Sequence, residues 1–85
     1  MKQVDYTITD EFGIHARPGG ELVKLAKTFS SAIKISCNGK EADAKRLIAV
    51  MSLGVKQGHT VSVCVEGDDE DTAIEQIGNF LKEKL

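Results

Sequence analysis

His15 and Arg17 stand two residues apart in the segment Gly13–Pro18, which places an imidazole and a guanidinium together where an amphipathic helix is expected to begin. Pro18 predicts that a helix begins here, because proline fixes φ near the helical value and its missing N–H is tolerated in a first turn. His15 is then expected at the N-cap, beside backbone N–H groups that lack acceptors inside the helix. Those donors, the helix dipole and Arg17 form a small anion site. An imidazole inside an anion site predicts a phosphohistidine.

The same motif has a simpler interpretation, a surface histidine near a helix cap with Arg17 as an ordinary solvated charge. A second block, residues 47–54 (Leu-Ile-Ala-Val-Met-Ser-Leu-Gly), helps to decide between the two. Together with Gly-Ile-His-Ala-Arg-Pro it resembles the HPr family, the histidine-containing phosphocarriers of the bacterial sugar phosphotransferase system. The spacing between the blocks matches without gaps, and the likeness extends over essentially all 85 residues.

This resemblance implies a function for the segment 13–18. The histidine matching His15 accepts a phosphoryl group from enzyme I, which draws it from phosphoenolpyruvate, and passes it to the IIA domains of sugar permeases. Arg17 is expected to stabilise the phosphoryl group, with Ala16 and Pro18 forming the helix N-terminus at the site. The protein would be a stoichiometric carrier that needs no cofactor and no metal.

The resemblance also implies a docking surface for partners beside the histidine. Leu47, Ile48 and Met51 are expected to contribute to it, since a short helix cannot bury every apolar side chain and methionine adapts to several partners. For Leu47 a place in the core is an equally good interpretation. The other side of the interface is expected to come from Ala16, Arg17 and Gly20.

Three positions depart from the family pattern. Many members carry a serine before the second block, which a dedicated kinase phosphorylates in Gram-positive bacteria, whereas this chain has Arg46. Ser52 is the nearest hydroxyl, although a serine in the last turn of a short helix is more often structural. Gly19 and Gly20 replace alanine or threonine and predict a looser first turn. These changes keep an alternative open, a regulatory paralogue that binds partners with little or no phosphoryl transfer.

Hydrophobic periodicity predicts seven elements. Strands are indicated by alternation around Val4–Ile8, Ile33–Ser36, Lys40–Ala42 and Thr60–Val65, with Asn38-Gly39 as a two-residue hairpin turn. Apolar residues at helical spacing indicate three helices. The first helix is expected to have an apolar face formed by Leu22, Leu25, Ala26 and Phe29. The second is a short helix expected to run from Leu47 to about Ser52. The apolar face of the last helix is expected to consist of Ala73, Ile74, Ile77, Phe80 and Leu81.

Turn and cap residues complete this pattern. Asp43 is a plausible cap for the short helix, Gly54 suits its exit, and Gly67–Asp69 is expected to cap the last helix. The order β-α-β-β-α-β-α predicts an α+β fold, an open-faced sandwich with three helices on one face of a four-stranded antiparallel sheet. It also fits a ferredoxin-like nucleic-acid module. That alternative is disfavoured because Tyr6 is in phase with the core, which leaves no aromatic platform for bases.

Composition limits the classes of protein to which this chain can belong. Eighty-five residues with 41% hydrophobic and 28% charged residues predict a single domain spanning residues 1–85. A net charge of −2 gives no reason to expect nucleic-acid binding. No apolar run approaches the roughly 20 residues that span a bilayer, and the first residues lack a signal peptide's apolar core. We expect a cytoplasmic monomer without membrane insertion.

The two cysteines are predicted to be reduced. Cys37 is in phase with Ile33 and Ile35, whereas Cys64 is out of phase with Val63 and Val65, so the two thiols should lie on opposite faces of the sheet. With His15 and His59 they form no recognisable zinc spacing.

Overall fold

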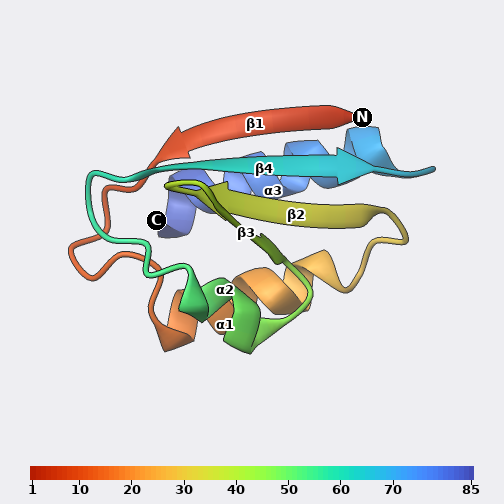
Figure 1. Ribbon diagram of the computed structural model, residues 1–85. Coiled ribbons are helices and arrows are strands. Elements are labelled where there is room, and N and C mark those ends of the chain that lie inside the picture. Colours follow the sequence, from red (N-terminus) through yellow and green to blue (C-terminus); the bar gives the residue numbers. More distant parts are fainter.

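The computed structural model describes residues 1–85 and contains the seven predicted elements in the predicted order (Figure 1). They are β1 (Lys2–Thr7), α1 (Ala16–Ala26), β2 (Ala32–Cys37), β3 (Lys40–Asp43), α2 (Leu47–Ser52), β4 (Thr60–Glu66) and α3 (Glu70–Lys84). None of the helices combines the length and apolarity that crossing a bilayer requires.

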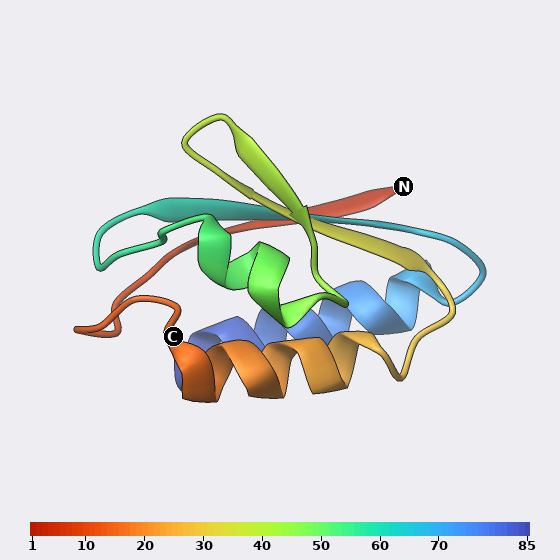
Figure 2. The same cartoon turned by 60° about the horizontal axis from the view of Figure 1, so that its bottom comes forward.

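The strands form one antiparallel sheet in the order β1-β4-β2-β3. The last strand of the sequence therefore lies inside the sheet, where Val63 pairs with Val4 on one side and with Ile35 on the other. All three helices cover the same face, and α1 and α3 run side by side beneath the sheet (Figure 2). The predicted open-faced sandwich is confirmed.

The core lies between this sheet and the helices. Val61, Val63 and Val65 of β4 are at most 1% exposed, and Ala73, Ile77 and Leu81 of α3 are fully buried beneath them. Tyr6 is half-buried and packs against the core. The alternate positions of the strands face away from the helices and carry no aromatic side chain, as expected.

The cysteines follow the same alternation. Cys37 is buried on the helix side, and Cys64 lies on the opposite face, where its thiol contacts Gln3. Both are free thiols, as the phase of the strands predicts. Asn38 and Gly39 both adopt positive φ, 53° and 80°, so the predicted hairpin turn between β2 and β3 is also confirmed.

The prediction that Asp43 caps α2 was wrong. Asp43 is still paired with Lys34 in the β2–β3 ladder, and its carboxylate accepts a hydrogen bond from the N–H of Lys45 (2.9 Å). The helix begins only at Leu47, and Arg46 occupies the N-cap with extended backbone and no side-chain cap. The aspartate therefore closes the turn that leads to the helix. The predicted exit at Gly54 is confirmed by its φ of 65°.

Asp69 occupies the predicted N-cap position of α3, but its carboxylate does not bind the amides of that helix. It accepts hydrogen bonds from the hydroxyl and N–H of Ser31 and from the N–H of Ser30. The Ser31 hydroxyl and then the Ser30 N–H lower the pKa of Asp69 from 3.8 to about 2. Asp69 thus ties the start of α3 to the segment entering β2.

Helix α1 is shorter than the apolar periodicity suggested. It ends at Ala26, and Phe29 lies three residues beyond it, still buried against the core. Val23, which the sequence pattern did not single out, is buried as well. The chain therefore turns after Ala26 while continuing to cover the same face of the sheet.

Candidate functional site

A turn before α1 presents the candidate site. Gly13 has a φ of 66°, and a Cβ at this position would collide with the carbonyl oxygen of Val55. The same carbonyl accepts the N–H of Ile14 (3.2 Å). Only glycine permits this close approach of two backbones, which orients the next residues.

His15 occupies the predicted N-cap of α1. Its backbone is extended, with φ −99° and ψ −176°, and its carbonyl accepts the first helical hydrogen bond, from Gly19 N–H (2.9 Å). Pro18 has no N–H, so the amides of Ala16 and Arg17 are the ones left without an acceptor within the helix. The imidazole, whose side chain is 42% exposed, does not cap them itself. These amides remain available to an anion.

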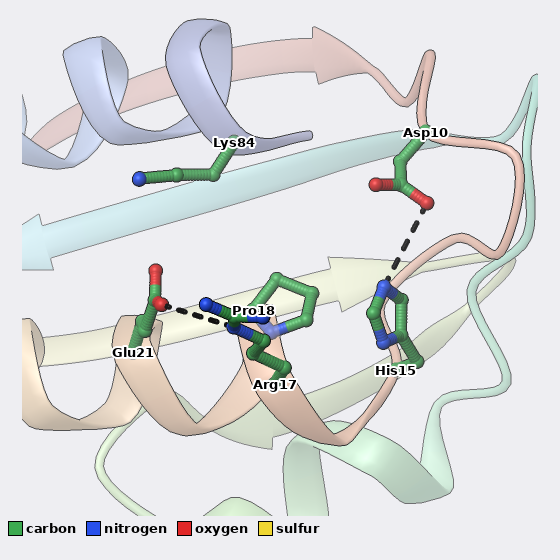
Figure 3. Close-up of a pocket in the computed structure, with 6 residues that line it drawn as sticks. All are labelled: Asp10, His15, Arg17, Pro18, Glu21 and Lys84. Atoms are coloured by element: carbon green, nitrogen blue, oxygen red, sulfur yellow. Dashed lines mark ion pairs between the residues drawn. The ribbon is translucent and has the colours of Figure 1, made fainter.

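The side chain of His15 borders an open hollow of about 220 Å³ (Figure 3). The other residues that line it are Asp10, Arg17, Pro18, Glu21 and Lys84. The hollow thus joins three elements, namely the loop after β1, the first turns of α1 and the end of α3. Its lining carries cations and acids in close proximity and contains no large apolar side chain.

Two ion pairs organise these charges. Nε2 of His15 lies 3.8 Å from Oδ1 of Asp10, and Nε of Arg17 lies 4.0 Å from Oε1 of Glu21 (Figure 3). Arg17 is 89% exposed, and its guanidinium is directed along α1 to Glu21 instead of toward the imidazole. The expected association of Arg17 with His15 is therefore not formed in this structure. An exposed pair of this kind is weak, so the arginine can leave it at little cost.

Sequence reasoning missed three residues of the hollow, Asp10, Glu21 and Lys84. Glu21 could have been found, since it is four residues beyond Arg17 and such pairs meet on a helix. Lys84 could not, because only the packing of α3 beside α1 brings it to the site. Asp10 belongs to a turn whose shape depends on contacts with the C-terminus, namely its N–H bond to the Leu85 carbonyl (2.8 Å).

The rings of Phe12 and His15 form a further contact. Their centroids are 5.8 Å apart and their planes are 82° apart, an edge-to-face arrangement. Phe12 is nevertheless 71% exposed, and its N–H donates to Oδ1 of Asp10 (2.8 Å). The imidazole is thus flanked by an aromatic ring and a carboxylate from the same turn.

A family model matches nearly the whole chain. The model, described as the PTS HPr component phosphorylation site, matches residues 2–83 of the chain.

The chain belongs to the HPr family.

Known members of the HPr family are similar throughout their length. The phosphocarrier protein HPr of Lysinibacillus sphaericus is 43% identical over 83 residues, which cover 98% of this chain and 94% of that protein. The crystal structure of HPr from Thermoanaerobacter tengcongensis has a TM-score of 0.94 at 40% identity, covering 99% of this chain and 94% of that one. The catabolite repression protein Crh of Bacillus subtilis has a TM-score of 0.78 at 30% identity, covering 100% and 98%.

The expected docking residues of an HPr-family member lie on α2, next to the start of α1. Ile48 is 77% exposed and Met51 39%, as expected, whereas Leu47 is half-buried and packs against the core. Leu47 therefore contributes to the core, and its part in docking stays a prediction. A Cβ added to Gly19 would lie 3.4 Å from Leu47 Cδ1 and 3.9 Å from Met51 Cγ, which shows how closely the two helices approach. Gly20 faces open space.

Arg46, which was expected at the position of the family's regulatory serine, is exposed at the N-cap of α2. Its Nε lies 4.0 Å from Oδ2 of Asp43. The hydroxyl of Ser52 donates to the carbonyl of Ile48 (2.7 Å), a local bond within α2. This contact fits a structural role for Ser52.

Proposed function

We propose that this protein is a phosphocarrier, in which Nδ1 of His15 accepts a phosphoryl group from enzyme I and passes it to IIA domains of sugar permeases. The observation that carries the proposal is the place of His15 at the N-cap of α1, beside the free amides of Ala16 and Arg17. This place falls within the region that matches the phosphorylation-site model.

The transfer needs only a nucleophile and an anion site. The lone pair of Nδ1 attacks phosphorus of the donor's phosphohistidine, and the electron pair of the breaking P–N bond returns to the donor nitrogen. The amides at the helix start and the helix dipole stabilise the phosphoryl oxygens on His15. Arg17 leaves Glu21 to join them, and Lys84 at the rim adds a second positive charge.

The site must also release the group. Its open form and the exposure of Arg17 give moderate stabilisation of the phosphoryl group, because exposed ion pairs are screened by water. Moderate stabilisation suits a carrier, since a tightly held group would not be transferred onward. Ile48, Met51 and the half-buried Leu47, together with Ala16, Arg17 and Gly20, form the proposed docking surface for both partners.

A regulatory binder is the second candidate. The similarity to Crh and the presence of Arg46 in place of the regulatory serine favour it. Such a protein would use the same docking surface without useful phosphoryl transfer. One crystal structure of Crh is a domain-swapped dimer, whereas we propose a monomer for this chain, which light scattering in solution tests.

Incubation with phosphoenolpyruvate and enzyme I, followed by phosphorus NMR, tests the carrier function. We expect one acid-labile, base-stable phosphoramidate on Nδ1 of His15, and its loss on addition of a IIA domain. His15→Ala should abolish it. His59→Gln is the matched control, because Nδ1 of His59 already accepts the N–H of Lys56 (3.1 Å) in a turn without an anion site. Label on His15→Ala, or no label on the wild type, would contradict the proposal.

A further inference from the structure

Asp10 is the acid that faces the imidazole of His15. Its Oδ1 lies 3.8 Å from Nε2, and the two side chains are 27% and 42% exposed. The other acid of the hollow, Glu21, is engaged with Arg17. Figure 3 shows the Asp10 carboxylate directed at the ring from the side opposite to the start of α1. The two nitrogens of His15 therefore have different surroundings, because Nε2 faces a carboxylate whereas Nδ1 makes no hydrogen bond to the helix start.

Backbone contacts fix Asp10 in this place. Its N–H donates to the carbonyl of Leu85 (2.8 Å), and its carbonyl accepts the N–H of Gly13 (3.0 Å). Its Oδ1 also accepts the N–H of Phe12 (2.8 Å), the residue whose ring edge contacts the imidazole. A carboxylate held by its own turn needs little further ordering to act on a neighbour. The separation of 3.8 Å is longer than a hydrogen bond, and contacts of this kind are often long without substrate and tighten when it binds.

We propose that Asp10 is a positioning residue for the phosphoryl transfer proposed above, on which this inference rests. Its carboxylate favours the tautomer with the proton on Nε2, which leaves the lone pair on Nδ1. When Nδ1 bonds to phosphorus, the ring keeps the Nε2 proton and becomes positively charged. The carboxylate offsets that charge. On onward transfer the electron pair of the P–N bond returns to Nδ1, the ring becomes neutral again, and no proton has moved.

A purely structural role is the competing explanation, since Asp10 also closes a turn. Asp10→Asn separates the two, because an amide oxygen can still accept the N–H of Phe12 whereas the negative charge is lost. Asp68→Asn is the matched control, removing the same charge from an exposed residue before the opposite end of α3. Asp10→Ala removes both the charge and the turn contact.

Nitrogen NMR of the His15 ring at alkaline pH, where the neutral imidazole is observed, reports the tautomer directly. We expect mainly the Nε2–H form in the wild type and in Asp68→Asn, and a shift toward Nδ1–H in Asp10→Asn. Phosphoryl transfer from enzyme I should slow about three- to tenfold in Asp10→Asn, the range of a partly exposed charge pair, and stay at the wild-type rate in Asp68→Asn.

Each outcome is decisive. A wild-type tautomer and rate in Asp10→Asn would overturn the proposal, and loss of function confined to Asp10→Ala would assign Asp10 to the turn alone. The tautomer measurement needs no phosphoryl transfer. If the wild type took up no phosphate, the carrier function would fail while the tautomer spectra still tested Asp10.

Discussion

The guanidinium of Arg17 pairs with Glu21, one turn further along α1, with 4.0 Å between Nε and Oε1. This contact occupies the cation that a phosphoryl group on His15 would attract. Glu21 therefore competes with the phosphoryl oxygens for the same side chain. The competition is weak, because the arginine is almost fully exposed, and the pair can exchange for the more highly charged phosphoryl group.

Replacing Arg17 with alanine should slow phosphoryl transfer strongly, by about tenfold or more, because charge-assisted hydrogen bonds to the phosphoryl oxygens are lost. The free energy of unfolding should change by less than about 0.5 kcal/mol, as for exposed substitutions generally. Arg17→Lys should restore the rate only in part, since lysine lacks the planar fork that binds two oxygens. Rapid-quench kinetics with enzyme I and urea unfolding measure the two effects.

Glu21→Gln is the matched control for Arg17→Ala. It leaves the arginine in place and removes its competitor, so transfer to His15 should be unchanged or somewhat faster. A wild-type rate in Arg17→Ala would instead show that the backbone amides alone form the anion site. A slow Glu21→Gln variant would show that the acid orients Arg17 and does not compete with the phosphoryl group.

Gly20→Ala should stabilise the protein by about 0.5–1 kcal/mol, since alanine is the better helix former and no atom lies within 4 Å of the added Cβ. Gly19→Ala should gain less, because its Cβ would meet Leu47 Cδ1 at 3.4 Å. Urea unfolding compares the two variants. A larger gain at Gly19 than at Gly20 would contradict the packing between α1 and α2 described here.

Asp69 predicts a loss of stability in acid. Hydrogen bonds from Ser31 and then Ser30 hold its pKa at about 2, below the value of 3.8 for the ordinary carboxyl group. The unfolded chain therefore binds the proton first as pH falls, and the stabilisation present above about pH 4 is lost as pH approaches 2. Asp69→Asn should be less stable than the wild type at pH 7 and approach it at pH 2. An equal difference at both pH values, measured by urea unfolding, would show that the charge of Asp69 is irrelevant.

The fold and the N-cap position of His15 could be predicted from the sequence because both depend on local signals. Alternation in the strands, the Asn38-Gly39 turn and the position of Pro18 do not require tertiary contacts. The cap at Asp43 was mispredicted because sheet pairing extends through that residue and delays the helix. Lys84 and Asp10 reach the site only through the packing of the C-terminal region against the loop after β1. No periodicity in the sequence reports such contacts.

Arg46 predicts that a serine kinase acting on HPr will not modify this protein. A kinase must hold its acceptor hydroxyl next to the transferred phosphate, and Arg46 has none. Ser52 is six residues further on, about 9 Å along the helix axis, and its hydroxyl already donates to the Ile48 carbonyl. Mass spectrometry after treatment with kinase and ATP should therefore find no phosphate on the wild type.

Arg46→Ser should restore the acceptor, provided that the kinase recognises the surface formed by Leu47, Ile48 and Met51. Serine is also a preferred N-cap residue, and Arg46 caps α2 without a side-chain hydrogen bond, so the variant should be more stable by about 0.5–1 kcal/mol. That gain, seen in urea unfolding, verifies that the variant folds as intended before the kinase is added. A stoichiometric phosphate on Ser52 of the wild type would refute the loss of regulation. A stable Arg46→Ser protein that accepts no phosphate would show that the docking surface has diverged from the one that the kinase recognises.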